Sequence, residues 1–337
     1  MHHNKDSFNF IDLFAGAGGL SEGFLSVGFK PIAHVEMNPD ACLTLQTRAC
    51  YHYLQKSGKN EIYHQYLRGE IDRDKLYSHV PPEELDSVIN QTISNESMPE
   101  LFSKIDSLMN KKFITSVDLI VGGPPCQAYS LVGRAVKTDS MQDDPRNFLY
   151  QLYCIVLKRY KPEMFVFENV PGLFTANGGK YFTNMTKDFK RFGYEVEYSV
   201  LNAFDFGVLQ NRLRVILIGW KKETNHKYPE FIKSHACFKV NDVLSDLPVM
   251  QAGDTNNNYR TSDFSSYLSM TGIRMKEDIL TWNTARPHIE RDREIYRLVI
   301  DAWNKNKTRL KYPNLPENLR THKNTKAFLD RFKVVAS

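Results

Sequence analysis

The feature that most limits the fold of this chain is a strand, a glycine turn and a helix near its start. An apolar run predicts a buried strand over residues 8–14, the turn follows at 15–19, and helical spacing continues over 20–25. A second apolar run ends at Glu36, about 20 positions after the turn, where nucleotide-binding folds place an acidic group on ribose hydroxyls. The turn lacks G-x-G-x-x-G spacing and a following phosphate-binding lysine. The pattern therefore favours a nucleoside ligand without a pyrophosphate.

The same alternation of apolar runs and helical spacing continues to about residue 220. Helices are predicted over residues 39–53 and 147–159. Residues 54–99 are polar and charged, with helical spacing and no recognisable chemistry, and we interpret them as a surface insert. Further strands are predicted over residues 31–36, 102–106, 117–121, 164–167, 194–200 and 214–220. Strands that alternate with helices indicate a doubly wound α/β fold, with a mostly parallel sheet covered on both faces.

The balance of charge changes along the chain. Residues 1–220 carry 23 Lys and Arg against 25 Asp and Glu, whereas residues 221–337 carry 21 against 14. Asn, Asp, Gly and Thr also become frequent near residue 221, and we place a domain boundary there. The 337 residues therefore allow a large α/β domain over 1–220 and a smaller region over 221–337. The basic excess fits a solvated surface as well as it fits a nucleic-acid-binding face.

The cysteine content and the hydropathy of the chain indicate the cellular compartment in which the protein works. An odd number of cysteines without metal-ligand spacing argues against a disulfide framework and a zinc site, so we expect reduced thiols and no metal. No stretch reaches the roughly 18 consecutive apolar residues of a membrane helix, and no signal pattern opens the chain. We therefore expect a soluble cytoplasmic protein without a membrane partner. The five cysteines are Cys42, Cys50, Cys126, Cys154 and Cys237.

One of these thiols follows a strand on a stiff connection. Residues 119–125 run from an apolar strand through two glycines and two prolines to Cys126. The prolines fix their own φ and bias the preceding residue toward extended geometry, so they hold the cysteine in one pose. The glycines let a ligand or a neighbouring backbone approach closely. A cysteine after a strand is more often a buried, inert thiol, and its neighbours must decide between the two interpretations.

Other reactive side chains follow neighbouring predicted strands. In doubly wound sheets, ligands bind outside the carboxyl ends of the strands, where this sequence places Asp106 and Glu168. Glu168 is a candidate acid or base beside a Cys126 nucleophile, whose thiolate Arg212 and Arg214 could stabilise. Taken alone, a strand-end carboxylate is usually solvated or caps a helix, and an arginine pair usually donates surface ion pairs. Their joint occurrence at successive strand ends favours a catalytic site.

Taken in order, these motifs resemble those of DNA cytosine-5 methyltransferases over residues 8–220. The resemblance implies a Rossmann-like methyltransferase fold that uses S-adenosylmethionine as methyl donor. Within it, Glu36 would bind the ribose and Asp106 the adenine amine. The implied cofactor contacts are Phe14, Ala15, Gly16, Ala17, Gly18, Gly19, Leu20, Glu36, Met37, Asp106, Gly123, Pro125 and Leu149. The implied catalytic residues are Cys126, Glu168, Arg212, Arg214, Pro125 and Gln127.

The resemblance also implies a mechanism. Cys126 would add to carbon 6 of a cytosine while Glu168 binds the ring nitrogen at position 3, so that carbon 5 takes the methyl group. Arg214 would hold the ring carbonyl, and Arg212 would help to position the thiolate. The target base must leave the duplex stack, at a cost of roughly a few kcal/mol. The polar run 130–144 is predicted to close behind it as a lid, and the implied DNA contacts are Ser130, Arg134, Lys137 and Asn169.

Two motifs that family members carry after the recognition region are missing from the sequence: an Arg-Glu-containing motif and a C-terminal Gly-Asn segment. Residues 284–288 and 291–293 resemble recognition-region segments of some members. We therefore expect either a shortened chain or one polypeptide of a split enzyme, completed by a polypeptide with the missing motifs.

The implied substrate is a specific duplex DNA site in the prokaryotic cytosol, within a bacterial or phage restriction-modification or DNA-protection system. Two alternatives remain. The first is a transfer-RNA cytosine-5 methyltransferase, which uses the same motifs, and the second is a non-catalytic DNA-binding subunit. A nicotinamide oxidoreductase is disfavoured by the glycine spacing and has no use for a Pro-Pro-Cys tip.

Overall fold

The computed structural model describes residues 7–125, 149–224, 226–234 and 238–323, together with residues 325, 328 and 332. The chain divides into two compact units, residues 1–236 and residues 237–337. The first unit is built on a seven-stranded sheet with the order β3-β2-β1-β4-β5-β7-β6. Its neighbouring strands pair in parallel, except that β7 is antiparallel to both β5 and β6. The strands are β1 (Asn9–Leu13), β2 (Lys30–Glu36), β3 (Val88–Asn90), β4 (Leu119–Gly122), β5 (Met164–Asn169), β6 (Tyr194–Asn202) and β7 (Leu213–Lys221).

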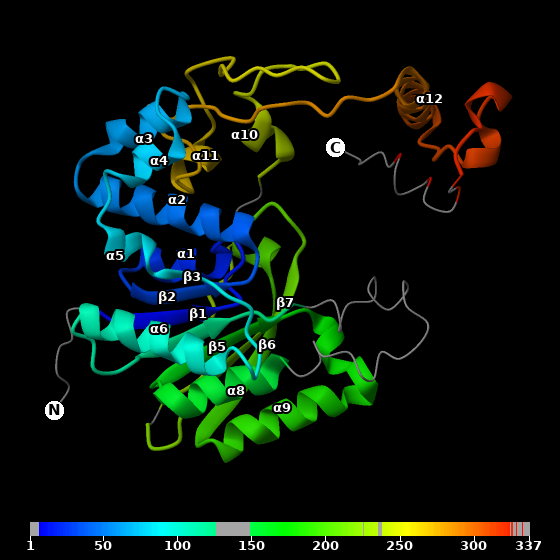
Figure 1. Cartoon of the computed structure of the whole chain (residues 1–337). Helices are drawn as coiled ribbons and strands as arrows, with labels where there is room; N and C mark the ends of the chain where they lie inside the picture. The colour runs from blue at the N-terminus through cyan, green and yellow to red at the C-terminus, as the bar shows by residue number, and fades with distance from the viewer. Residues whose placement is uncertain are drawn as a thin grey trace. The chain divides into compact units, whose positions relative to one another are not determined.

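Helices cover both faces of this sheet, as Figure 1 shows. On one face lie α1 (Gly19–Ser26), α2 (Pro39–Lys56), α3 (Asn60–Leu67), α4 (Arg73–Tyr77) and α5 (Pro82–Leu85). On the other face lie α6 (Met98–Lys111), α8 (Leu149–Tyr160) and α9 (Lys180–Arg191). Short 3₁₀ turns, η4 (Pro171–Phe174), η5 (Ala176–Gly179) and η6 (Ala203–Phe206), connect the later elements. This α/β architecture, with a largely parallel sheet between two helical layers, is the fold that the sequence predicts.

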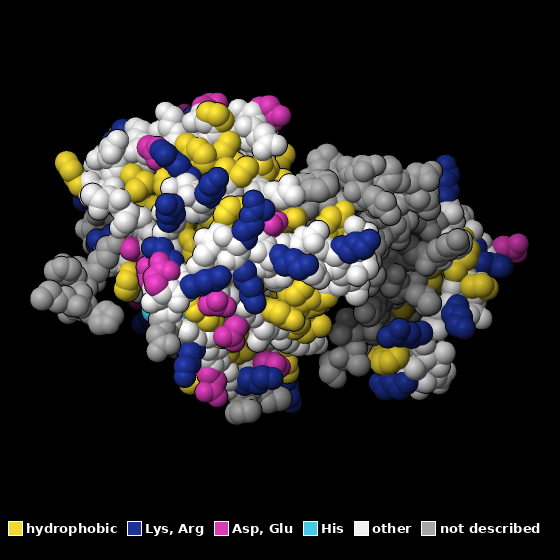
Figure 2. Space-filling model, turned by 90° about the horizontal axis from the view of Figure 1, so that it is seen from below, with side chains coloured by type: hydrophobic (Ala, Val, Ile, Leu, Met, Phe, Trp, Pro, Cys, Tyr) yellow, Lys and Arg dark blue, Asp and Glu magenta, His cyan; other side chains and the backbone are white. Residues whose placement is uncertain are grey.

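Strand alternation sends side chains from β1 into two separate apolar clusters. Ile11 and Leu13 join the large cluster that α6, α8 and α9 complete, whereas Phe10 packs against Phe24 and its neighbours on α1. Figure 2 views the face that carries α8 and α9, where Lys and Arg side chains are interspersed with acidic and apolar ones. Apolar clusters on both faces of the sheet therefore fix the strands whose ends carry the reactive side chains.

The structure corrects two predictions between residues 54 and 111. The predicted strand over residues 102–106 is the middle of α6, whose buried residues Met98, Leu101, Ile105 and Leu108 recur at helical spacing. The true third strand is β3, which lies inside the segment that we interpreted as a surface insert. The rest of that segment, α3 to α5, packs on α2 through a second apolar cluster, which contains Cys50, Leu54, Leu76 and Val80.

The second unit contains a long helix, several short elements and an apolar cluster around that helix. Its helices are α10 (Val240–Leu244), α11 (Ser266–Met270) and α12 (Glu290–Asn306), followed by η7 (Tyr312–Asn314) and η8 (Glu317–Leu319). Ile295 and Val299 of α12 pack with Leu315, Leu319, Phe328 and Phe332. Elsewhere, Arg274 forms a buried ion pair with Asp246 at 3.3 Å and lies over the ring of Tyr259. Within the described parts of both units, no helix combines the length and the apolar character that crossing a bilayer requires.

Candidate functional site

Strand register brings the predicted site residues to one edge of the sheet. Leu13, the last residue of β1, pairs with Val35 and with Gly122, the last residue of β4. Gly122 in turn pairs with Phe167, directly before Glu168. Since β7 runs antiparallel, its first residues lie at this same edge, where Glu168 pairs with Ile216. The carboxyl ends of β1, β2, β4 and β5 and the start of β7 therefore surround one site.

The carboxylate of Glu36 ties the glycine turn to the end of β2. One oxygen accepts a hydrogen bond from the backbone N–H of Gly16 at 2.8 Å, and the other accepts from Asn38 at 2.8 Å. Gly18 has φ 86°, and a Cβ there would lie 2.9 Å from Cδ2 of Leu45, so both conformation and space require glycine. The turn therefore opens α1 with its backbone close to a half-buried carboxylate.

The loop after β4 approaches Glu168 so closely that any side chain at Gly123 would force the carboxylate or the loop to shift. A Cβ built on Gly123 would lie 2.7 Å from Oε2 of Glu168. On its other side, the Glu168 carboxylate forms an ion pair with Nε of Arg214 at 2.6 Å. Both partners are about three-quarters buried, with side-chain exposures of 26% and 22%. The structure thus brings together the predicted residues Gly123, Glu168 and Arg214.

Arg212 lies in the turn that leads into β7 and is exposed. Its backbone N–H donates to Oδ1 of Asn202 at 2.9 Å, and its carbonyl accepts from Ala203. Asn202 also donates to Oδ1 of Asn211, so one amide side chain fixes the turn. Sequence reasoning did not single out Asn202, although an asparagine at a strand end is a common turn-forming signal.

Asn169 does not have the role that we predicted for it. Its side chain is only 1% exposed, donates to the carbonyl of Pro124 at 3.3 Å, and accepts from the N–H of Val170. A buried amide that is engaged in this way cannot reach DNA phosphates or bases. Asn169 instead joins the end of β5 to the loop that precedes Cys126.

The prediction for Asp106 is also wrong. Asp106 lies on α6 and not at a strand end, and it binds Arg159 at 2.6 Å and the hydroxyl of Tyr160 at 3.0 Å. The hydrogen bond between Asp106 and Arg159 is the main cause of the raised pKa of the Arg159 guanidinium. The residue at the corresponding strand end is Asn90, whose amide donates to the carbonyls of Glu36 and Met37. The last residue of β3 pairs with Glu36, which makes the loop after β3 the neighbour of the glycine turn.

Several predicted residues lie outside the described part of the chain: Cys126, Gln127, Ser130, Arg134 and Lys137. The described thiols, Cys42, Cys50 and Cys154, are buried. Burial raises the pKa of Cys50 to about 11 and that of Cys154 to about 12, and it also raises the pKa of Cys42. None of these three presents the accessible thiolate that nucleophilic attack requires.

The remaining predicted cofactor residues flank the same edge or follow it. Phe14 has φ 59°, a left-handed conformation that is rare for an aromatic residue, and it directly follows β1. Met37 is 61% exposed after β2, and Leu149 begins α8. Within the described segments, no group of three or more His, Cys, Asp or Glu side chains is placed to hold a metal ion.

Comparison with known proteins agrees with this geometry. The sequence profile of C-5 cytosine-specific DNA methylases matches residues 8–76 and 73–331. The chain is 42% identical to the type II methyltransferase M.Bpa9945I of Bacillus paralicheniformis, over 96% of this chain and 80% of that protein. It is 35% identical to M1.HphI of Haemophilus parahaemolyticus, over 74% of this chain but only 55% of that protein.

A solved structure shows the same fold. It is described as a DNA modification methyltransferase encoded within an Escherichia coli prophage, and it matches with a TM-score of 0.50 and 23% sequence identity. The match covers 75% of this chain and 60% of that one. With the family profile matching nearly the whole chain and a relative above 40% identity, this protein belongs to the C-5 cytosine-specific DNA methylases.

Proposed function

We propose that this chain methylates carbon 5 of a cytosine that has been extruded from a specific site in duplex DNA. The observation that carries the proposal is the contact of Gly123 with Glu168 and the ion pair of Glu168 with Arg214. These contacts support the proposal because the carboxylate and the guanidinium lie beside Gly123, three positions before Cys126 in the sequence. The names of the relatives support a role in type II restriction-modification.

The glycine turn and Glu36 fit S-adenosylmethionine as the methyl donor. Two lone pairs of the Glu36 carboxylate are used by backbone N–H groups, which leaves acceptor capacity for the hydroxyls of a ribose. Space at the turn is open, since a Cβ on Gly16 or Gly19 would meet nothing within 4 Å. The position beside the adenine, which the sequence assigned to Asp106, then belongs to Asn90 at the end of β3 and to the residues that follow it.

The chemistry of the protein side chains begins with the thiolate of Cys126. Its sulfur bonds to carbon 6, and the electrons of the ring double bond move toward carbon 5, while Glu168 holds ring nitrogen 3 and Arg214 holds the ring carbonyl. When bound, S-adenosylmethionine supplies the electrophilic methyl group that carbon 5 captures. A base then removes the proton from carbon 5, the bond between sulfur and carbon 6 breaks, and the ring regains its aromaticity. Arg212, exposed beside Arg214, would help to keep the sulfur anionic.

Trapping with 5-fluorocytosine tests this mechanism. Fluorine on carbon 5 cannot leave as a cation, so the methylated base should stay bonded to the protein in duplex oligonucleotides. We expect a donor-dependent adduct that peptide mass spectrometry maps to Cys126, and no adduct with the Cys126→Ser protein. An adduct on another cysteine, or equal methylation by the serine variant, would contradict the proposal.

The same assay tests substrate and partner. Tritiated methyl transfer is compared between duplex DNA and transfer RNA, and a preference for RNA would give the reaction to the alternative substrate. Each reaction is run with the chain alone and with a polypeptide that carries the missing family motifs. If a complementing polypeptide completes the enzyme, methyl transfer should be faster in the mixture than with the chain alone. An unchanged rate would contradict this prediction.

A further inference from the structure

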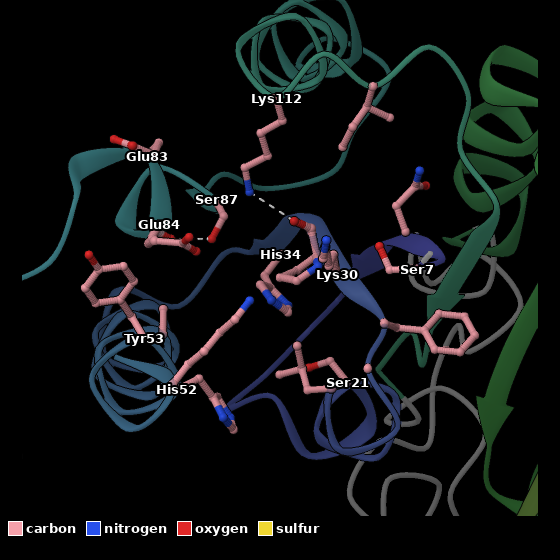
Figure 3. A pocket seen from close by; sticks show the side chains of 18 of the residues that line it. Ser7, Ser21, Lys30, His34, His52, Tyr53, Glu83, Glu84, Ser87 and Lys112 are labelled. Atoms are coloured by element: carbon pink, nitrogen blue, oxygen red, sulfur yellow. Dashed lines mark hydrogen bonds between the residues drawn. The ribbon is translucent and has the colours of Figure 1, made fainter. Parts of the chain in front are cut away.

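A cavity of about 1050 Å³ lies at the amino-terminal end of the sheet. Lys30, the first residue of β2, lines it, whereas Glu36 at the other end of the same strand belongs to the proposed methyl-transfer site. Residues of α1, α2 and α5 and the segment after α6 form its walls, as Figure 3 shows. Its volume is at the upper end of the range for small-molecule sites, about 300–1000 Å³. The cavity therefore opens at the opposite end of β2 from Glu36, and only its Ser21, Leu45 and Arg48 wall adjoins the glycine turn.

The lining of this cavity carries more positive than negative charge. Its charged residues are Lys30, Arg48, Lys56, Lys111 and Lys112, against Glu83 and Glu84. Three of the five cations already have partners. Arg48 binds Glu22, Lys111 binds Asp86 at 3.1 Å, and Lys112 donates to the carbonyl of Pro31 at 3.0 Å.

The two remaining cations are Lys30 and Lys56. In the described part of the chain, no ion pair or side-chain hydrogen bond involves the ammonium of Lys30 or that of Lys56, and both residues are exposed. The carbonyl that receives Lys112 belongs to Pro31, next to Lys30, so the ammonium of Lys112 lies close to the start of β2. Burial lowers the pKa of Lys112, and the nearby carboxylates of Glu84 and Glu83 offset part of this effect.

His34 lies in this cavity above a buried carboxylate. Its Nδ1 lies 3.5 Å from Oδ2 of Asp12, and the two side chains are only 8% and 1% exposed. Neither atom has a hydrogen-bond partner, which is rare for buried polar groups in native proteins. The backbone of His34 is fixed, since its N–H donates to the carbonyl of Ser87 at 2.7 Å. Figure 3 shows the imidazole near the centre of the cavity, between Lys30 and Ser87.

The structure assigns to this cavity a second ligand site, for a small phosphorylated molecule whose phosphate is held by Lys30, Lys56 and His34. Lysine ammonium groups bind phosphate as mobile point charges, and a ring N–H of His34, whose imidazole lies against Asp12, adds a fixed donor. Glu83 and Glu84 line the same cavity and would repel a second anionic group. They can instead accept hydrogen bonds from hydroxyl or amino groups of the ligand. The class is therefore a phosphomonoester with a neutral or cationic remainder.

Calorimetric titration of the full chain with glucose 6-phosphate tests this assignment, with glucose as the uncharged comparison. We expect a dissociation constant below about 1 mM for the phosphoester and no heat from glucose. Each titration is repeated with saturating S-adenosylhomocysteine, so that binding at the carboxyl ends of the strands is excluded. An unchanged affinity in its presence supports a separate site, whereas competition would overturn it. The measurement involves no methyl transfer and stands whether or not the proposed reaction is correct.

Matched double variants identify the residues. Lys30→Ala with Lys56→Ala removes the two unpaired cations and should weaken binding at least about tenfold, the loss of one charge-assisted interaction or more. Lys187→Ala with Lys190→Ala removes the same charge from exposed positions on α9, and binding should stay within about twofold. Equal effects of the two doubles, or no binding by the parent protein, would overturn the assignment. If Lys30→Ala with Lys56→Ala weakens duplex DNA binding while glucose 6-phosphate gives no heat, the phosphates belong to DNA and the small-ligand site is wrong.

Discussion

The two ends of the central sheet differ in how their polar groups are satisfied. At the carboxyl-terminal end, Glu36 accepts two backbone hydrogen bonds and Glu168 is paired with Arg214. At the amino-terminal end, Lys30 has no ion-pair partner among the described residues, and neither do the facing atoms of Asp12 and His34 have a hydrogen-bond partner there. The first end is pre-organised by the protein's own contacts. The second end exposes the ammonium of Lys30, whereas the facing atoms of Asp12 and His34 are buried against each other.

The difference has a topological origin. Parallel strands present their carboxyl ends and the turns that follow them together, so backbone N–H groups and side chains from several loops meet there. At the amino ends of the strands lie helix C-termini. In this protein, two of those helix ends carry lysines. Lys112 directly follows α6, and Lys56 is the last residue of α2. Positive side chains at these positions also interact favourably with the helix dipoles.

The largest expected effect tests the close packing at the carboxyl-terminal end. In Gly123→Ala, the added Cβ would lie 2.7 Å from Glu168 Oε2, so the carboxylate or the loop must move. A displacement of about 1 Å at a reacting group costs on the order of 100-fold in rate. We expect turnover in the tritiated-methyl assay to fall by about this factor.

Gly23→Ala on α1 is the matched control, because its Cβ meets nothing within 4 Å. It should retain full activity and gain about 0.5–1 kcal/mol in the free energy of unfolding. Full activity of Gly123→Ala would show that the contact with Glu168 is not functional.

A smaller effect is expected from Glu36→Gln. Glutamine keeps one acceptor oxygen but turns an N–H₂ group toward the N–H of Gly16 or of Asn38, and it removes the charge. The loss of a hydrogen bond to a charged group, about 1.5–3 kcal/mol, corresponds to roughly 10- to 100-fold weaker binding of S-adenosylmethionine in calorimetry. Asp40→Asn removes an exposed charge four residues later and should leave affinity within about twofold. If both variants bind equally well, Glu36 does not hold the donor.

The smallest effect concerns the amino-terminal end. Phe113 lines the cavity, is 93% exposed and has φ 55°, a left-handed conformation just after α6 that normally selects glycine. Phe113→Gly should therefore raise the free energy of unfolding by about 1 kcal/mol, measured by chemical denaturation. Phe113→Ala keeps the Cβ and should change stability little. If alanine stabilises as much as glycine, the gain comes from removing an exposed ring and not from relieved backbone strain.

Much of the site could be predicted because its signals are local in sequence. The glycine turn, the strand that ends in Glu36 and the strand that ends in Glu168 each combine a hydrophobic period with a chemical group within a few residues. The errors arose where the spacing of apolar residues was assigned to the wrong type of secondary structure. Residues 102–106 are apolar enough for a strand, but the wider spacing from Met98 to Leu108 is helical. A three-residue strand such as β3 is too short to show any period.

Asn169 shows an error that the sequence contained the means to avoid. Successive strand residues point to opposite faces, and the burial of β5 alternates, with Phe165, Phe167 and Asn169 inside. A Glu168 on the less buried face therefore implies a buried Asn169. The partner of its amide, the carbonyl of Pro124, lies 45 residues away and could come only from the fold.

The sequence by itself determined the family, the α/β alternation and the candidate reactive groups, because these depend on residue type and on spacing along the chain. Only the tertiary structure decided which groups meet. It set the contact between Gly123 and Glu168, the ion pair with Arg214, the removal of Asp106 from the cofactor site, and the cavity around His34. Each of these depends on strand register and helix packing, which join residues far apart in sequence. Such pairings are fixed by burial of the whole core and leave no local pattern.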